Sequence, residues 1–246
     1  MFKARRIQTL RNAKSASGDL ENSQHAVYMD GTDDYMNLAV EHATTFAGDF
    51  STSMWFYSTE TNNSESSYLW YTGSSGNYIY SFLFQDDIYF GLDSANANIS
   101  ASVLTTNRWN HIVHSYDDTN NVAKTFLNGV EVDSDSIDKE VITDGVNFTV
   151  GAATTGGTGF KGYISNIALY SNNMTINEVK TIYNDKQPFN HMDWQFAKHL
   201  VGWWRCGDGK ENATGSTIYD MSNSSNNFTL RNNAVIKPWP NMMELK

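Results

Sequence analysis

A tight hairpin turn is the feature that most restricts how this chain can fold. Residues 122–127 and 130–132 alternate apolar and polar side chains around Asn128-Gly129, a dipeptide that accepts the positive φ angles of a two-residue β-hairpin turn. A further strand is expected at residues 109–116, followed by a polar turn that returns the chain antiparallel. The sequence therefore predicts a meander of three consecutive strands.

The same alternation recurs in short segments along the chain, separated by Gly, Asn, Asp and Ser. Such segments are typical of strands in sheets with one solvated face. We expect further strands at residues 26–30, 35–38, 50–57, 68–71, 78–84, 88–92, 147–150 and 162–170. Many short strands at this spacing favour a sandwich. The predicted fold is therefore all-β, a two-sheet antiparallel jelly-roll sandwich with one short helix.

The expected helix lies near the end of this series. Thr175 and Glu178 have the spacing of a capping box, and Ile176, Val179 and Ile182 fall on one apolar stripe. These signals predict roughly two to three helical turns.

A chain of 246 residues can form one such sandwich with additions at both ends. We predict a basic arm at residues 1–20, the jelly roll at 21–184, and a linker of mixed polarity at 185–199. Residues 200–246 contain further β-like segments. They either complete the same sandwich, which is the favoured interpretation, or pair with an edge strand of a neighbouring subunit.

Charge is distributed unevenly along the chain. There are 17 basic against 27 acidic side chains, a formal net charge of -10, so nucleic acid is not an expected partner. The first 14 residues are instead basic. They predict an arm that docks on an acidic surface, or alternatively a disordered solubilising tail. The docking residues are Phe2, Lys3, Arg5, Arg6, Arg11 and Lys14.

Neither a membrane span nor export by a secretory signal peptide is expected from the sequence. No run of 18 apolar residues is present, so no membrane span is predicted. The first twenty residues lack the apolar stretch of a secretory signal peptide. Cys206 is the single cysteine, and it cannot form an intrachain disulfide.

Several segments occur in an order that matches a known family. They are Tyr28-Met-Asp-Gly-Thr-Asp-Asp-Tyr35, Phe50-Ser-Thr-Ser-Met-Trp-Phe56, Asn107-Arg-Trp-Asn-His-Ile-Val113, Phe126-Leu-Asn-Gly-Val130 and Phe160-Lys-Gly-Tyr-Ile-Ser-Asn-Ile-Ala-Leu-Tyr170. They resemble the successive strands of laminin-G-like, concanavalin A-like jelly rolls. The resemblance covers roughly residues 24–184 and is specific for fold. It implies no single function, because this fold hosts lectins, adhesion modules, glycanases and structural proteins.

The tail carries a second resemblance. Residues 200–209 and 218–230 resemble the strand pair that usually precedes the Asp-Gly strand of such domains, but here the pair comes last. Chains in this order, with a basic leader and no signal peptide, look like laminin-G-like proteins of tailed bacteriophage particles. The resemblance implies a non-enzymatic virion structural protein, made in the host cytoplasm and placed on the capsid or tail. Its expected partners are other virion proteins, further copies of the chain and host glycans.

Two other functions stay open. The first alternative is a lectin-like carbohydrate-binding adhesion module that is not restricted to virions. The second is a glycoside hydrolase.

Aromatic residues are the candidate sugar contacts. Flat rings with polar edges can stack on sugar faces. The candidates are Tyr68, Trp70, Tyr71, Tyr78 and Tyr80. Phe82 and Phe84 continue the alternation begun by Tyr78 and Tyr80, and because alternating aromatics usually pack in a core, core packing is the favoured interpretation.

Calcium is the candidate metal, although no cofactor is required. Many concanavalin A-like domains hold calcium at a sheet rim, and the resemblance implies Asp30 as a ligand. The family's acidic partner is replaced by Ser165 and Asn166, which leaves Asn166 as the second candidate. Alternatively, Asp30, Asp33 and Asp34 shape turns.

A glycanase on this fold would need two paired carboxylates. Alternation would place Glu131, Asp133 and Asp135 on one face, with a spacing similar to the signature of laminarinase-like enzymes, except that the third residue is Asp. They lie on the return arm of the hairpin, which favours a solvated edge. No catalytic residue is predicted.

His111 and His114 are three residues apart on an expected strand. An odd offset points two side chains to opposite faces of a sheet. They are therefore not expected to bind one metal ion together.

Overall fold

A computed structural model describes residues 24–38, 45–60, 65–74, 77–92, 98–101, 104–139, 147–153 and 159–240. The basic arm predicted at residues 1–20, with all six of its docking residues, lies outside this part of the chain.

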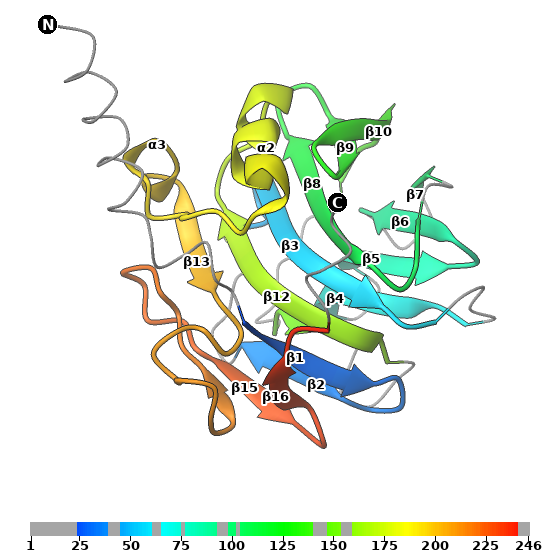
Figure 1. Ribbon diagram of the computed structural model, residues 1–246. Coiled ribbons are helices and arrows are strands. Elements are labelled where there is room, and N and C mark those ends of the chain that lie inside the picture. The colour runs from blue at the N-terminus through cyan, green and yellow to red at the C-terminus, as the bar shows by residue number, and fades with distance from the viewer. Residues whose placement is uncertain are drawn as a thin grey trace, which may run out of the picture.

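The described residues form two eight-stranded sheets whose strand pairings are all antiparallel (Figure 1). Sheet A has the order β10-β9-β8-β3-β12-β1-β16, with β13 also paired to β12. Its strands are β1 (His25–Asp30), β3 (Phe50–Ser58), β8 (Trp109–Asp117), β9 (Val122–Leu127), β10 (Val130–Ser136), β12 (Lys161–Tyr170), β13 (Leu200–Trp204) and β16 (Val235–Pro238).

Sheet B has the order β14-β15-β2-β11-β4-β5-β6-β7. Its strands are β2 (Tyr35–Leu38), β4 (Ser67–Ser74), β5 (Asn77–Phe84), β6 (Asp87–Gly91), β7 (Asn98–Ala101), β11 (Thr149–Val150), β14 (Thr217–Ile218) and β15 (Phe228–Arg231). The predicted all-β sandwich is confirmed.

The core lies between the two sheets. Alternate residues of each strand enter it, such as Met54 and Phe56 from sheet A and Ile79 and Leu83 from sheet B. His114 joins the sheets within this core, because its Nε2 lies 2.8 Å from Ser81 Oγ and its Nδ1 3.1 Å from Thr125 Oγ1. A buried polar side chain needs such partners to offset its lost hydration.

The predicted meander is confirmed as β8-β9-β10. At the turn, Asn128 has φ 52° and Gly129 has φ 78°, as a two-residue hairpin of this kind requires. Asn128 also uses its side chain, since its Oδ1 accepts the His111 N–H at 2.9 Å. The turn is therefore tied to the neighbouring strand.

The predicted helix is α2 (Ile176–Tyr183), and it lies across the outer face of sheet A (Figure 1). Thr175 and Glu178 form both hydrogen bonds of the capping box. Val179 and Ile182 are buried against sheet A in a cluster that includes Ala168. Burial of this one apolar stripe holds a helix of eight residues, which is too short to be stable alone.

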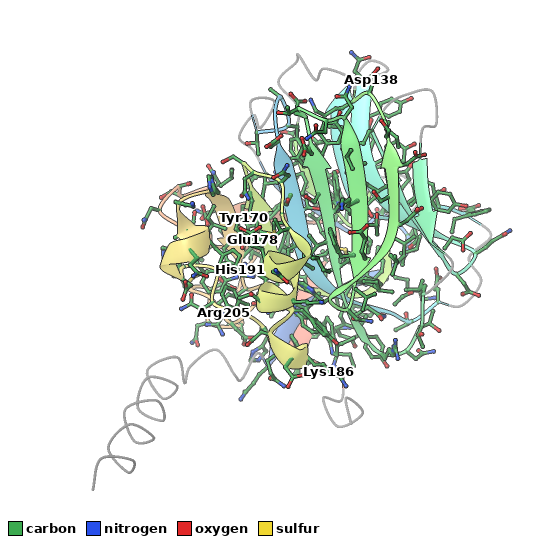
Figure 2. All side chains as sticks on the ribbon, turned by 90° about the horizontal axis from the view of Figure 1, so that it is seen from above. Asp138, Tyr170, Glu178, Lys186, His191 and Arg205 are labelled. Carbon is green, nitrogen blue, oxygen red and sulfur yellow. The ribbon has the colours of Figure 1, made fainter. Side chains whose placement is uncertain are left out.

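Residues 185–199, expected as a linker, also pack on sheet A. This segment overlaps η1 (Asn184–Lys186) and includes α3 (Trp194–Ala197). Phe196 joins the buried cluster with α2, and the buried His191 is hydrogen-bonded through Nδ1 to the Tyr170 hydroxyl (Figure 2). Burial of apolar side chains such as Phe196 lowers the free energy of this packed arrangement relative to that of a solvated linker. Within the described ranges, no helix has the length and apolar character needed to cross a membrane.

The tail pairs with both sheets of its own chain among the described residues. β13 pairs with β12, β15 with β2, and β16 with β1. The loop between β14 and β15 is organised by Asp220, a buried carboxylate. It accepts the backbone N–H groups of Trp203, Ser222 and Asn226 at 2.8–3.0 Å.

Acid should destabilise the protein through three buried histidines. Burial lowers the pKa values of His111, His114 and His191 to about 3, below the value of about 6.5 in an unfolded chain. The unfolded state therefore binds protons first, so stability is complete above about pH 6.5 and is lost as the pH falls toward 3. Each histidine contributes a loss of about 1.4 kcal/mol per pH unit.

Urea denaturation followed by circular dichroism at pH 7 and pH 5 measures this effect. We expect a clearly lower midpoint at pH 5, both for the native chain and for a His199→Gln control at a half-buried position. An unchanged midpoint would contradict the prediction.

Candidate functional site

The outer face of sheet B carries a cluster of aromatic side chains. On β5, Ile79 and Leu83 enter the core, so the residues that alternate with them face outward. Rings from β4 and β6 extend the cluster, which we call the tyrosine face. It comprises Tyr68, Tyr71, Tyr78, Tyr80, Phe82, Phe84 and Tyr89.

A bulge in β4 decides which aromatic residues belong to this face. The register of β4 against β5 shifts between Tyr68 and Trp70, and both Leu69 and Trp70 enter the core with no exposed surface. Tyr68 and Tyr71 consequently share the outer face although they are three residues apart. The prediction that Trp70 contacts sugar is therefore wrong, because simple alternation does not hold across a bulge.

The rings of the tyrosine face contact one another closely. Tyr68 lies 5.4 Å from Phe82 and 6.1 Å from Tyr80 between ring centroids, and Tyr71 lies 5.7 Å from Tyr78. Tyr68, Tyr71 and Tyr78 are half-buried, whereas Tyr80 is only 5% exposed. Tyr68, Tyr71 and Tyr78 thus lie outside the core between the sheets, whereas Tyr80 is buried as expected. The predicted sugar contacts other than Trp70 come together on one outer side of sheet B.

The hydroxyls of this face stay protonated at neutral pH. Burial, together with the neighbouring Tyr78 and Tyr68 hydroxyls, raises the pKa of Tyr71 to about 12. Burial and Tyr78 also raise the pKa of Tyr68. The hydroxyls of Tyr68, Tyr71 and Tyr78 form no hydrogen bond to another described residue. They are thus available both to donate and to accept.

Polar groups lie on the same face of sheet B, on the far side of β11. Asn37 alternates with the core residues Met36 and Leu38, so it faces outward. Its Oδ1 accepts the Nε–H of Arg231 from the neighbouring strand at 2.8 Å. Between them and Tyr71, Thr149 is buried and its hydroxyl donates to backbone carbonyls. The sequence held no signal for this arrangement, because it depends on strand order.

The two predicted calcium ligands do not meet. Asp30 pairs with Lys161 at one end of the β1–β12 ladder, whereas Asn166 lies five residues further along β12, about 16 Å from Lys161 at the rise of a strand. Asn166 is fully buried, and its Nδ2 donates to Ser165 Oγ at 3.0 Å. Asn166 is therefore not a partner of Asp30.

Asp30 is instead grouped with Asp33 and Asp34, with candidate ligand oxygens within 4.8 Å of one another. Two of these carboxylates shape the turn, since Asp30 Oδ1 accepts the Thr32 N–H and Asp34 Oδ2 accepts the Asp30 N–H. Burial raises the pKa of Asp34, and the charges of Asp30 and Asp33 raise it further. Calcium binding here stays a prediction.

Glu131 and Asp133 of the hairpin do not share one face of the sheet. A bulge between Glu131 and Asp133 places Glu131 opposite Phe126 and Asp133 opposite Thr125, which face opposite sides of β9. The expectation that one face carries all three carboxylates is therefore wrong. Glu131 is exposed and pairs with Lys124 at 3.1 Å.

His111 and His114 point to opposite faces, as predicted. His114 lies in the core between the sheets, whereas His111 Nε2 lies 2.9 Å from Ser53 Oγ on the outer side of sheet A. Their rings cannot bind one metal ion.

A polar groove of about 440 Å³ lies between the start of α2 and strands β8 to β10. It is lined by Ser115, Asp117, Asn120, Val122, Lys124, Ser134, Asn173, Met174 and Thr175. Hydrogen bonds from Asn120 lower the pKa of Asp117, so this carboxylate is ionised. No aromatic ring lines the groove, which distinguishes it from the tyrosine face.

Residues 30–180 match a family profile described as the concanavalin A-like lectin/glucanases superfamily. The chain belongs to this superfamily. The match covers more than half of the sequence and spans both the tyrosine face and the acidic turn at Asp30. The expected family is thereby confirmed.

Solved structures share the fold at low sequence identity. A Bacteroides ovatus protein, named as a candidate carbohydrate-binding protein, matches with a TM-score of 0.67 and 18% identity over 89% of this chain. This chain spans 60% of that protein's length. A Limulus polyphemus pentraxin matches with a TM-score of 0.54 and 13% identity, over 66% of this chain and 83% of its own.

A third similar structure is the CBM40 module of a Ruminococcus gnavus sialidase bound to α2,3-sialyllactose. Its TM-score is 0.51 at 13% identity, over 65% of this chain and 98% of the module. A search of curated proteins found no match. None of the three structures named here is a virion protein, so the phage particle stays a prediction.

Replacing Trp70 should cost stability and not report on ligand binding. Trp70→Ala removes a fully buried indole that contacts Phe46, Phe90 and Phe148, a loss of about 3–5 kcal/mol. Tyr71→Ala, outside the core, should cost much less. Urea denaturation of both variants tests this, and equal losses would argue against the assigned faces.

Proposed function

We propose that this chain is a non-catalytic carbohydrate-binding module that holds a glycan on its tyrosine face. The observation that carries the proposal is the position of Tyr68, Tyr71 and Tyr78, which are half-buried on the outside of a sheet whose other side fills the core. Each offers an apolar ring and a hydroxyl without a partner among the described residues. Sugars present the matching combination of apolar C–H faces and polar edges.

The tyrosine face also suits ligand binding energetically. Tyrosine has only two side-chain torsions to order, so it gives a large contact area at small entropic cost. The rings already pack against one another at 5.4–6.1 Å, which fixes them before a ligand arrives. Such preorganisation reduces the cost of binding.

The similar structures support the same class of function. Two of the three named above are, by name, a candidate carbohydrate-binding protein and a carbohydrate-binding module. Their identity to this chain is low, so they support the fold as a suitable scaffold and do not identify the sugar. A non-catalytic role is supported by the separation of Glu131 from Asp133 at the β10 bulge.

Display on a bacteriophage particle remains compatible with this proposal. The expectation of display on a particle rests on the order of the tail segments and on the basic leader. The expected virion partners, the assembly of several copies and the location in the virion rest on the same two features. Mass spectrometry of purified particles tests that placement independently of sugar binding.

Substitution of the tyrosine face should weaken glycan binding. We expect the full chain to give a reproducible signal on a glycan array, and Tyr71→Ala and Tyr78→Ala each to weaken binding of the best glycan at least about fivefold in calorimetry. The reason is that stacked rings supply the contact area, at about 1 kcal/mol or more for each aromatic contact.

Tyr219→Ala is the matched control. Tyr219 is an exposed tyrosine, 38% accessible, that follows β14 at the far edge of sheet B, and its loss should leave affinity unchanged. The proposal fails if the array shows no binding, or if Tyr71→Ala and Tyr78→Ala bind as tightly as the control.

A further inference from the structure

A second row of aromatic rings crosses the outer face of sheet A, on the opposite side of the sandwich from the tyrosine face. Tyr28 is directly opposite Tyr163, Tyr163 opposite Tyr57, and Tyr57 opposite Trp109. These four residues come from β1, β12, β3 and β8, and we call them the sheet A row. Successive ring centroids are 5.0, 6.0 and 5.8 Å apart.

The sheet A row faces away from the core. Val27, Ile164 and Phe56, the neighbours of its tyrosines along each strand, all belong to the core between the sheets. Tyr28, Tyr57 and Tyr163 themselves are half-buried. Their hydroxyls make no hydrogen bond to another described residue.

One end of the row holds a buried donor that lacks a partner. Trp109 is 3% exposed, and its Nε1 has no hydrogen-bond partner among the described residues. An indole N–H can only donate, and a buried donor left unpaired costs free energy. A ligand oxygen would satisfy it.

The other end of the row holds a cation. Lys237, on β16, places its Nζ 3.5 Å from the centroid of the Tyr28 ring, and no carboxylate of the described residues forms an ion pair with it. Asp30, at the end of β1, and Glu60, just after β3, have other partners, since Glu60 pairs with Lys161 at 3.5 Å and Asp30 Oδ1 accepts the Thr32 N–H.

The available polar groups are therefore mostly donors. Trp109 Nε1 and Lys237 Nζ donate only. Burial and the adjacent Tyr28 and Tyr57 hydroxyls raise the pKa of Tyr163, which keeps its hydroxyl protonated and able to donate. Such a set matches a ligand that is rich in acceptor oxygens and carries negative charge.

We propose that the sheet A row is a second saccharide site and that its ligand is an acidic sugar, a hexuronate, whose carboxylate pairs with Lys237 while its ring contacts the tyrosines. This inference does not rest on the tyrosine face. The two surfaces lie on opposite sides of the sandwich, so one chain could hold two glycan segments at once.

Calorimetry of the full chain with tetragalacturonate and with its methyl ester tests the proposal, because the two probes share their rings and differ in charge. We expect the acid to bind at least tenfold more tightly than the ester, with an affinity that falls as salt is added. Lys237→Gln should reduce the affinity for the acid at least tenfold and leave that for the ester unchanged. Tyr163→Phe, which removes only a hydroxyl, should weaken binding of the acid.

Lys198→Gln, at an exposed lysine near α3, is the charge-matched control and should bind the acid like the native chain. Equal affinities for acid and ester, no binding at millimolar concentrations, or no difference between Lys237→Gln and Lys198→Gln would each overturn the proposal. Loss of neutral-glycan binding with intact, Lys237-dependent binding of tetragalacturonate would overturn only the function proposed for the tyrosine face.

Discussion

The pairing of β12 with three other strands is the interaction on which the rest of sheet A depends. β12 lies against β3 on one side, and on its other side it pairs first with β1 and then with β13. The change of partner occurs at a bulge next to Asn166, which has a positive φ of 46°. There Ser165 Oγ donates to the carbonyls of His25 and Arg205, each at 3.3 Å. One strand thus joins the start of the fold to its tail, so neither end is an appendage to a finished sandwich.

Local signals identified the elements well, because they depend on neighbours in sequence. The Asn128-Gly129 turn and the Thr175–Glu178 capping box each specify a backbone conformation by themselves. Bulges limited what alternation could predict. The bulge at Trp70 adds one residue to β4 relative to β5. This candidate sugar contact therefore lies in the core and not on the outer face. The same irregularity separates Glu131 from Asp133. A bulge has no reliable mark in a single sequence, because it is stabilised by packing on both sides of the sheet.

Binding surfaces are harder to predict than elements because they are assembled across strands. Tyr28, Tyr57, Trp109 and Tyr163 are spread over more than half of the chain, and only the register of four strands aligns them. Their individual positions in alternating segments are ordinary. The tyrosine face could be predicted in part from the sequence, because β4 and β5 are consecutive strands. One short connection makes Tyr71 and Tyr80 direct neighbours.

The tail also contributes to the sheet A row that is proposed as a second binding surface. β16 closes the edge of the sheet beside β1 and brings Lys237 over the ring of Tyr28. Immediately after it, Trp239 stacks on Trp109 at 4.1 Å between ring centroids and donates its Nε1–H to the His25 carbonyl at 2.5 Å. The segment that pairs with the edge of β1 therefore also provides the cation at one end of the row and a ring that stacks on the indole at the other. Because these contacts need β16 in register, the sheet A row gains Lys237 and the stacking of Trp239 only when the tail has paired with β1.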